Sequence, residues 1–215
     1  MNFQRQVGIF DPKKFKDIEV SIIGTGAVGS FIALAVAKMG LSNIHLFDPD
    51  MVSEHNLPNQ FYRIEDIGKH KVKALAEIIE DFSGVKPEIR SEHYSGAKLK
   101  GIVIVAVDSM DARKTIWLLL RRQPLIGLMI DVRMGGEVAW VLAINPGLDR
   151  EYYEGTLYSS DEALHLACTE QSIIYTVLGT ACASSAIVKS YLLNQPIPKE
   201  LILDFRLGIL LKNTK

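Results

Sequence analysis

VSIIGTGAVG, residues 20–29, carries the clearest fold signal in the chain. Its first four residues form a short and nearly continuous apolar run, as in a strand that helices cover on both faces of a sheet. Glycines follow at 24, 26 and 29, and the Ala-rich residues 27–39 have the composition of a helix that Gly40 would end. The order strand, glycine turn, helix predicts the first unit of a layered α/β domain.

The three glycines of this turn have different expected roles. Gly24 lets the chain leave the strand sharply, Gly26 lets a phosphate approach backbone amides, and Gly29 lets the helix pack closely on the sheet. The helix that begins at Ala27 also presents unpaired N–H groups and the positive end of its dipole. Asp48 stands 19 residues after Gly29, where it could accept hydrogen bonds from ribose hydroxyls. The pattern favours a nucleotide over a turn that binds nothing, and it does not separate NAD from ATP.

Strands and helices alternate along much of the chain, which indicates a parallel sheet with helical crossovers. The expected strands are 20–23, 43–47, 87–94, 101–107 and 125–132, and the expected helices are 27–39, 67–82 and 111–120. After Gly135-Gly136 an antiparallel strand is expected at 137–144, a helix at about 170–193, and a closing hairpin at 201–205 and 207–211. The prediction is one α/β domain, 1–215, with a Rossmann-like, mainly parallel sheet, helices on both faces and antiparallel strands toward the C-terminus. Residues 145–168 form a long crossover-type connection, and such connections are usually functional.

The composition fits one domain with a sizeable core, because 48% of the 215 residues are hydrophobic. The 24 basic and 25 acidic residues nearly cancel, so we expect neither direct nucleic-acid binding nor membrane association. Cys168 and Cys182 form no C-x-x-C pair, which argues against a disulfide framework and a four-cysteine zinc site and fits a cytoplasmic location. The longest uncharged run, 171–188, is short and polar for a membrane span and is interpreted as a buried helix.

A second group of motifs follows the glycine turn, and a dehydrogenase would not need it. It consists of Val52-Ser53-x-x-Asn56-Leu57-x-x-Gln60, then Lys71 at the start of a helix, Asp108 after the fourth strand and Arg113 five residues later. With these motifs the sequence resembles the ThiF/MoeB/HesA family, the adenylating domains related to ubiquitin-activating enzymes. The resemblance runs from Arg5-Gln6 to about Lys189 and includes Gly24–Gly29, Asp48-x-Asp50, Gly68-x-x-Lys71-Val72, Arg133-Met-x-Gly and Cys168-x-Glu170. An NAD(P)-dependent oxidoreductase is the weaker alternative, supported only by the glycine turn and Asp48.

The resemblance implies an ATP-dependent adenylyltransferase. Such enzymes activate the C-terminal carboxylate of a small ubiquitin-like or sulfur-carrier protein, typically ending in Gly-Gly, or of a peptide. The carboxylate attacks the α-phosphate of MgATP, which gives an acyl-adenylate and pyrophosphate. The reaction depends mainly on positioning and charge neutralisation. The expected cofactors are therefore ATP and Mg²⁺, without zinc, since the zinc-binding cysteine pairs of many relatives are missing.

The resemblance also implies roles for individual residues in binding the cofactors. Asp48 would hold the ribose, with Asp50 beside it in the same motif, and Lys71 would pair with phosphate oxygens. Asp108 would hold Mg²⁺, since hard cations take carboxylate oxygen. Asn56 would orient a phosphate or the substrate backbone.

Arg5 would reach the nucleotide of a partner subunit, which implies a homodimer. Simpler alternatives stay open for three of these residues. Lys71 could be a solvated lysine in a basic helix start, Asp108 could be the N-cap of the helix that follows it, and Arg5 could be an ordinary surface arginine. Arg113 and Arg133 are interpreted as structural.

Asn59 departs from the family pattern, which usually has an arginine in contact with the ATP phosphates at this position. Asparagine is neutral, and a catalytic arginine contributes about 10³–10⁵ in rate in other phosphoryl-transfer enzymes. Arg63, Lys69 or Arg5 of a partner could supply the missing charge, or the enzyme could be slow. Otherwise the chain would be a non-catalytic family member that binds nucleotide or only a partner, in a homodimer or beside an active relative.

Cys168 lies where the resemblance places a cysteine that takes the acyl group, or joins in sulfur transfer, in some relatives. It would open a helix, whose N-terminus lowers a thiol pKa, and His165 is three residues away. The alternative is a small buried hydrophobe, which is also the interpretation of Cys182. No residue of the chain identifies the substrate.

Overall fold

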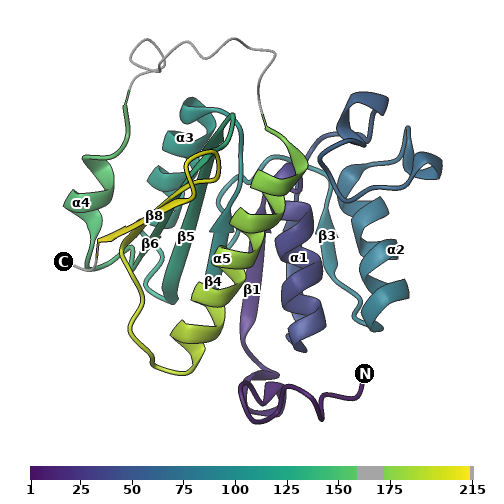
Figure 1. The fold of residues 1–215 in the computed structure, drawn as a ribbon, viewed down its shortest axis with the longest axis horizontal. Coiled ribbons are helices and arrows are strands. Elements are labelled where there is room, and N and C mark those ends of the chain that lie inside the picture. Colours follow the sequence, from purple (N-terminus) through teal and green to yellow (C-terminus); the bar gives the residue numbers. More distant parts are fainter. Residues whose placement is uncertain (159–171, 214–215) are drawn as a thin grey trace.

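The computed structural model describes residues 1–158 and 172–213, and a single eight-stranded sheet forms its centre (Figure 1). The strands are β1 (Glu19–Ile23), β2 (Asn43–Phe47), β3 (Glu88–Arg90), β4 (Gly101–Val105), β5 (Ile126–Gly135), β6 (Val138–Ile144), β7 (Glu200–Asp204) and β8 (Ile209–Asn213). The helices are α1 (Ala27–Met39), α2 (Lys71–Ser83), α3 (Met110–Leu120), α4 (Arg150–Glu154) and α5 (Ile174–Leu192). Short 3₁₀ helices lie at Pro12–Phe15, Glu54–Asn56 and Ile64–Asp66.

The strand order β3-β2-β1-β4-β5-β6-β7-β8 divides the sheet into two halves. The strands from β3 across to β5 pair in parallel, whereas β5–β6, β6–β7 and β7–β8 are antiparallel pairs. Every residue of β1 is buried, as expected for a parallel strand that helices cover on both faces. The predicted α/β class, the mainly parallel sheet and the antiparallel C-terminal strands are therefore confirmed.

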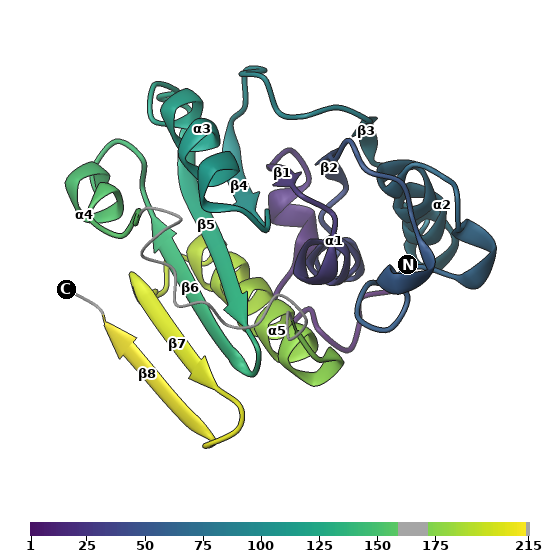
Figure 2. The same cartoon turned by 90° about the horizontal axis from the view of Figure 1, so that it is seen from above.

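Helices cover both faces of the sheet (Figure 2). On one face α1, α2 and α5 enclose a core that includes Ile32, Leu75 and Val177. On the other face α3 and α4 bring together Trp117 and Tyr153, whose ring centroids are 4.5 Å apart. The crossovers α1 and α2 therefore lie on one side of the sheet and the crossover α3 on the other.

Several elements differ from the sequence prediction. Helix α2 begins at Lys71 rather than at residue 67, because Gly68 has a φ of +84° that interrupts a helix. The strand expected at 87–94 is only the three exposed residues of β3 at the edge of the sheet. The connection after Asn145 contains α4, whose Tyr153 is fully buried. The last long helix begins at Ile174 rather than near 170, and residues 159–171 lie outside the described part.

Helix α5 is buried on one side only, so its interpretation as a buried helix is wrong for the other side. Val177 and Val188 face the core, whereas Ile174 and Leu178 are exposed. Cys182 is also exposed, which corrects its interpretation as a buried hydrophobe. Within residues 1–158 and 172–213, each helix is too short or too polar to cross a membrane.

The strand order reverses where β1 and β4 lie side by side, and a crevice is expected at the carboxyl ends of these two strands. From β1 the chain runs outward to β2 and β3, and it then returns to β4 on the opposite side of β1. In open α/β sheets ligands bind outside the carboxyl ends of the strands at such a reversal of strand order. The glycine turn follows β1 and residues 106–108 follow β4, so the topology brings these two segments to the same crevice.

Candidate active site

The glycine turn after β1 is closed at two positions by packing and is open at the third. A Cβ at Gly24 would lie 2.5 Å from the carbonyl oxygen of Ala106, and a Cβ at Gly29 would overlap the carbonyl oxygen of Gly24. Gly24 also has a φ of +92°, which only glycine adopts readily. At Gly26 the nearest atom to such a Cβ is the side-chain nitrogen of Gln60, 3.9 Å away. Packing therefore requires Gly24 and Gly29, whereas Gly26 leaves room for a ligand against the backbone.

Asp48 directly follows β2 and uses its carboxylate to shape the glycine turn. Its Oδ2 accepts hydrogen bonds from the backbone N–H of Thr25 at 2.7 Å and from the Thr25 hydroxyl at 3.1 Å. Its Oδ1 accepts the backbone N–H of Asp50 at 2.9 Å. Because a carboxylate has about four acceptor positions, these bonds leave little capacity for a ribose. The predicted ribose contact stays a prediction, and the observed role of Asp48 is to hold the turn.

Tyr62, Thr25 and Ser30 brace the same turn, and the sequence analysis did not select them. The Tyr62 hydroxyl donates to the carbonyl oxygen of Thr25 at 2.6 Å, and burial raises the pKa of Tyr62, so it remains a donor at neutral pH. The Ser30 hydroxyl accepts the backbone N–H of Phe61 at 3.0 Å. These bonds tie the loop around residues 56–62 to the glycine turn. The only local signal was the position of Thr25 inside the glycine motif.

Lys71 is buried at the start of α2 and forms an ion pair with Asp50. Its Nζ lies 2.8 Å from Oδ2 of Asp50, and its backbone N–H donates to the carbonyl oxygen of the same residue at 2.9 Å. The Lys71 side chain is 8% exposed, whereas that of Asp50 is 61% exposed. The alternative of a solvated lysine is therefore wrong. Asp50 instead holds a buried ammonium group with its own charge open to solvent.

Asp108 is exposed after the carboxyl end of β4 and does not cap α3. The N-cap of α3 is Ser109, whose side chain accepts the backbone N–H of Ala112 at 3.1 Å, so the N-cap alternative for Asp108 is wrong. Asp108 lies two residues after Ala106, whose carbonyl contacts the glycine turn. No cluster of three or more His, Cys, Asp or Glu side chains forms a metal site in the described residues. A cation at Asp108 would therefore need phosphate oxygens or water as further ligands.

The loop after Asp50 uses its amide side chains partly within the protein. Asn56 is buried, and its Oδ1 accepts hydrogen bonds from the Ser53 backbone N–H at 3.0 Å and hydroxyl at 2.8 Å. Asn59 donates from Nδ2 to the hydroxyl of Ser172 at 2.9 Å. The buried Oε1 of Gln60 has no partner among the described residues, although its Nε2 lies beside Gly26. Gln60, which belongs to the second motif but had no predicted role, is thus a candidate ligand contact.

Arg63 and Lys69, the expected substitutes for a missing phosphate-binding arginine, are already paired. Both bind Asp66, whose side chain is fully buried, with distances of 3.0 Å from Arg63 Nε and from Lys69 Nζ. Although burial opposes its charge, bonds from the two cations lower the pKa of Asp66. Both also approach the half-exposed Glu77. Neither cation is therefore available without leaving Asp66 buried and less well paired.

Arg113 and Arg133 are structural, as the sequence analysis proposed. Both bind the fully buried Asp131, at 2.6 Å from Arg113 Nε and 2.8 Å from Arg133 Nε. Arg113 also donates to the carbonyl oxygen of Val107 at 2.6 Å, which holds the backbone just before Asp108. This cluster joins α3, β5 and the segment that leads to the site.

Arg5 does not meet the other predicted site residues within one chain. The side chain of its neighbour Gln6 donates to the carbonyl oxygen of Met39 at 2.7 Å, and Phe3 packs against Gly40. The N-terminal segment thus lies at the C-terminal end of α1, whereas the glycine turn is at the other end (Figure 1). Helix α1 has 13 residues and is about 20 Å long. Arg5 could therefore serve a glycine turn only in another copy of the chain.

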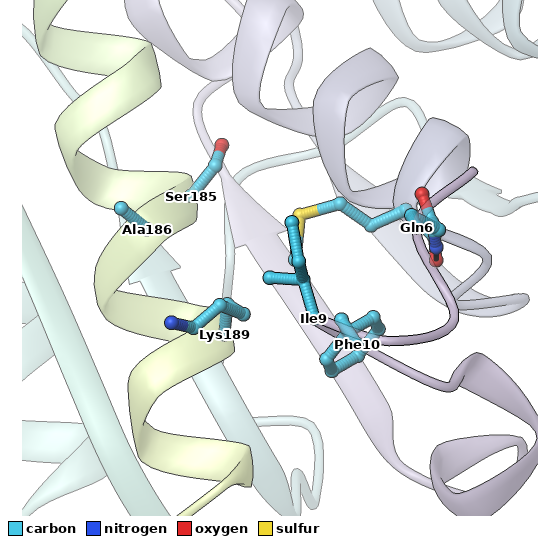
Figure 3. A pocket seen from close by; sticks show the side chains of 7 residues that line it. Gln6, Ile9, Phe10, Ser185, Ala186 and Lys189 are labelled. Atoms are coloured by element: carbon cyan, nitrogen blue, oxygen red, sulfur yellow. Dashed lines mark hydrogen bonds between the residues drawn. The ribbon is translucent and has the colours of Figure 1, made fainter. Parts of the chain in front are cut away.

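A shallow apolar groove lies between the N-terminal segment and α5, away from the glycine turn (Figure 3). Its volume is about 230 Å³, and its lining is Gln6, Ile9, Phe10, Met39, Ser185, Ala186 and Lys189. Cys168 and His165, the candidates for covalent chemistry, lie outside the described residues. The predicted residues that lie on the segments after β1, β2 and β4, or bond to them, are Gly24, Gly26, Ala27, Gly29, Asp48, Asp50, Asn56, Asn59, Lys71 and Asp108.

A family model described as the ThiF family matches residues 2–195. The chain belongs to the ThiF family. This family of E1-like adenylyltransferases acts on the C-termini of ubiquitin-like proteins or peptides, and the predicted family is thereby confirmed. Membership favours ATP over the NAD alternative for the glycine turn.

Two relatives of this ThiF-family chain each carry the name ubiquitin-like modifier-activating enzyme 5. The protein of Oryza sativa subsp. japonica is 30% identical over 92 residues, which cover 42% of this chain and 21% of that protein. The protein of Branchiostoma floridae is 26% identical over 164 residues, which cover 66% of this chain and 40% of that protein. The matches therefore span less than half of these relatives.

Solved structures share the fold of this ThiF-family chain at low sequence identity. The structure of E. coli MccB with ATP has a TM-score of 0.73 and 14% identity, and the match covers 94% of this chain and 65% of that chain. The structure of PaaA has a TM-score of 0.75 and 19% identity, with coverage of 94% and 65%. MccB has also been solved with MccA bound. These likenesses establish an E1- and MccB-like Rossmann fold.

Proposed function

We propose that this chain is an ATP-dependent enzyme that adenylates the C-terminal carboxylate of a small ubiquitin-like or sulfur-carrier protein, or of a peptide. The observation that carries the proposal is the open Gly26 backbone, with the buried Lys71 and the exposed Asp108 at the same crevice. In the proposed step a carboxylate oxygen attacks the α-phosphorus of ATP. The bond between the α-phosphorus and the bridging oxygen breaks, and pyrophosphate leaves with the electron pair.

The crevice fits ATP in two respects. The free space over Gly26 adjoins the N-terminus of α1, where backbone N–H groups and the helix dipole favour a phosphate. The unpartnered Oε1 of Gln60 is an acceptor that a bound ligand or water would satisfy. When bound, ATP supplies the electrophilic α-phosphorus and the pyrophosphate leaving group. Asp48 and Asn56 keep the turn and the adjoining loop in the shape that receives it.

Lys71 and Asp108 supply the charges that the step requires. Lys71 is held by Asp50, whose carboxylate is mostly exposed, so the ammonium group can turn to a phosphate while Asp50 is re-solvated. Asp108 is exposed after β4 without a capping role, and it would offer carboxylate oxygen to a Mg²⁺ that the phosphates also bind. A low-dielectric wall around Lys71 strengthens its attraction for developing negative charge.

The missing positive charge at Asn59 would come from Arg5 of a second copy in a homodimer. Arg5 lies at the wrong end of α1 for its own site, and the nearby groove of Figure 3 is apolar. Large apolar side chains are also exposed on the N-terminal segment and, separately, at the start of α5: Val7, Ile9, Ile174, Tyr175 and Leu178. Such a surface on a single chain marks an interaction site.

A mixing experiment tests the contribution of the partner. Homodimers of Arg5→Ala and of Lys71→Ala should each be inactive. After equal mixing and subunit exchange, about a quarter of all sites should combine an intact Lys71 with an intact Arg5 of the other subunit. No recovery of activity, or a monomer in sedimentation at working concentration, would contradict the homodimer.

Adenylation itself is tested by ATP–pyrophosphate exchange with candidate carrier proteins that end in Gly-Gly. We expect exchange that requires both the carrier and Mg²⁺, and a raised Mg²⁺ requirement in Asp108→Asn. The matched control is Asp17→Asn, since Asp17 is exposed before β1, at the far end of that strand. Absence of exchange at saturating MgATP, with every carrier protein whose gene lies near the gene for this chain, would argue against adenylation.

The second candidate is a non-catalytic family member that binds nucleotide or a partner. It is favoured by one observation: Asn59 bonds to Ser172, while Arg63 and Lys69 remain paired with Asp66. Calorimetry with ATP, combined with the exchange assay, separates the two candidates. ATP binding without exchange, and with no gain from a second subunit, would support the binding protein.

A further inference from the structure

Asn59 makes a contact that joins two distant parts of the chain. Its Nδ2 donates to the Ser172 hydroxyl at 2.9 Å and lies 3.4 Å from the carbonyl oxygen of the same residue. The two residues are 113 positions apart, and Ser172 lies two positions before the first residue of α5. Both side chains are partly buried, so water competes less for this bond than at an exposed site.

The start of α5 depends on such contacts because it has no side-chain cap. Its N-cap is Ile173, which makes no capping hydrogen bond. Ser172 forms a parallel β-bridge with Gly136, and the Tyr175 hydroxyl donates to Glu137, so one side of this segment is tied to the turn between β5 and β6. The bond from Asn59 ties the other side to the loop beside the glycine turn.

Hydrogen bonds join that loop to the glycine turn. The Phe61 N–H donates to the Ser30 hydroxyl at 3.0 Å, and the Tyr62 hydroxyl donates to the Thr25 carbonyl at 2.6 Å. A short path therefore leads from the glycine turn through Asn59 to the start of α5.

We propose that Asn59 is a positioning residue, which sets the start of α5 relative to the nucleotide-binding turn through Ser172 and does not bind phosphate itself. The inference rests on the proposed function for its effect on turnover, while the contact itself is tested without it. A fixed start of α5 keeps the loop beside the glycine turn in place, and a small displacement of a reacting group costs rate. Loss of the bond should therefore slow the reaction more than it weakens ATP binding.

A double-mutant cycle on Asn59→Ala and Ser172→Ala tests the contact without any activity. Hydrogen exchange of the amides in the first turn of α5 should become about three- to tenfold faster in each single variant. The double variant should be no faster than either single one, because both remove the same bond. Additive effects, or no effect of Asn59→Ala, would show that the two residues are not coupled.

Exchange kinetics then separate positioning from phosphate binding. We expect both single variants to lower kcat about three- to tenfold, with the KM for ATP within about twofold of the wild type. Ser172→Thr, which keeps the hydroxyl, should restore kcat. An increase of about tenfold or more in the KM for ATP in Asn59→Ala, with Ser172→Ala unaffected, would show that Asn59 contacts the phosphates. If the wild type shows no exchange, the adenylation proposal fails, and the hydrogen-exchange cycle still decides whether Asn59 positions α5.

Discussion

Two ionic clusters lie near the carboxyl ends of the parallel strands, and they differ in the exposure of the acid. In the pair of Lys71 and Asp50 the lysine is 8% exposed and the acid 61% exposed. In the cluster of Arg113, Asp131 and Arg133 the acid is fully buried, and the arginines are 4% and 7% exposed. Lys71 can leave its partner because water takes over the charge of Asp50. The arginines cannot do so, since Asp131 would remain buried and unpaired. The first cluster therefore suits a charged ligand, and the second stabilises the fold.

The largest effect is expected from breaking the buried cluster. Asp131→Asn removes the charge between two buried arginines and should lower the free energy of unfolding by about 3–5 kcal/mol. It also weakens the hydrogen bond that the Tyr153 hydroxyl donates to Asp131 at 3.0 Å. Urea unfolding followed by circular dichroism measures the change. A loss below about 1 kcal/mol would mean that water or a rearrangement replaces Asp131.

Breaking the pair of Lys71 and the exposed Asp50 should affect function far more than stability. Lys71→Ala should reduce exchange by about 10²–10³-fold, because the ammonium group would act on charge that develops in the transition state. The free energy of unfolding should fall by less than in Asp131→Asn, since Asp50 is left in water and no buried charge loses its partner. Lys73→Ala is the matched control, because Lys73 lies on the same helix and is exposed. Equal loss of activity in both variants would contradict a specific role for Lys71.

The exposure of Glu154 lies between those of Asp131 and Asp50, and its pKa predicts that stability depends on pH. Hydrogen bonds from Trp117, Arg121 and Arg150 lower the pKa of Glu154 from 4.5 to about 2. Because this pKa is lower in the folded state, its stabilisation is present above about pH 4.5 and is lost as the pH falls toward 2. Urea midpoints of the wild type and Glu154→Gln should therefore differ at pH 6 and converge near pH 2. A constant difference over this range would rule out the titration of Glu154 as the cause.

The smallest change in stability is expected for an exposed acid whose basic partner is also bound to a second acid. Asp81 is 66% exposed and lies 3.5 Å from Arg63, which keeps its bond to the buried Asp66. Asp81→Asn, the same substitution as at Asp131, should change the free energy of unfolding by less than about 0.5 kcal/mol. Urea unfolding under identical conditions gives the direct contrast. A loss similar to that of Asp131→Asn would mean that burial of the acid does not distinguish the two clusters.

Lys71 and Asp108 show how far local sequence patterns reach. The alternation of apolar strands and helices correctly predicted that Asp108 follows a strand of the parallel sheet, and the motif correctly placed Lys71 at the start of a helix. The pattern left open whether Lys71 is solvated and whether Asp108 is a cap. Burial against Asp50 and the capping bond of Ser109 answered these questions, and both depend on neighbours that local periodicity does not show.

Asn59 and Arg5 show what required the folded chain. The sequence identified Asn59 as a departure from the family pattern, but its partner Ser172 is 113 positions away. Likewise the resemblance implied that Arg5 serves a partner subunit, and only the folded chain shows that its segment packs at the end of α1 away from the glycine turn. No short-range pattern contains such distances.

The glycine turn, the α/β class and the acids at the strand ends can be read from the residues in order, because steric limits and apolar periodicity act over a few positions. Whether each charge is available to a ligand cannot be read from the residues in order. It depends on burial and on partners from distant segments, as in the bond of Asp48 to Thr25, the pair of Lys71 and Asp50, and the contact of Asn59 with Ser172. Long-range packing sets these contacts, and with them the difference between a charge that can bind a ligand and one that stabilises the fold.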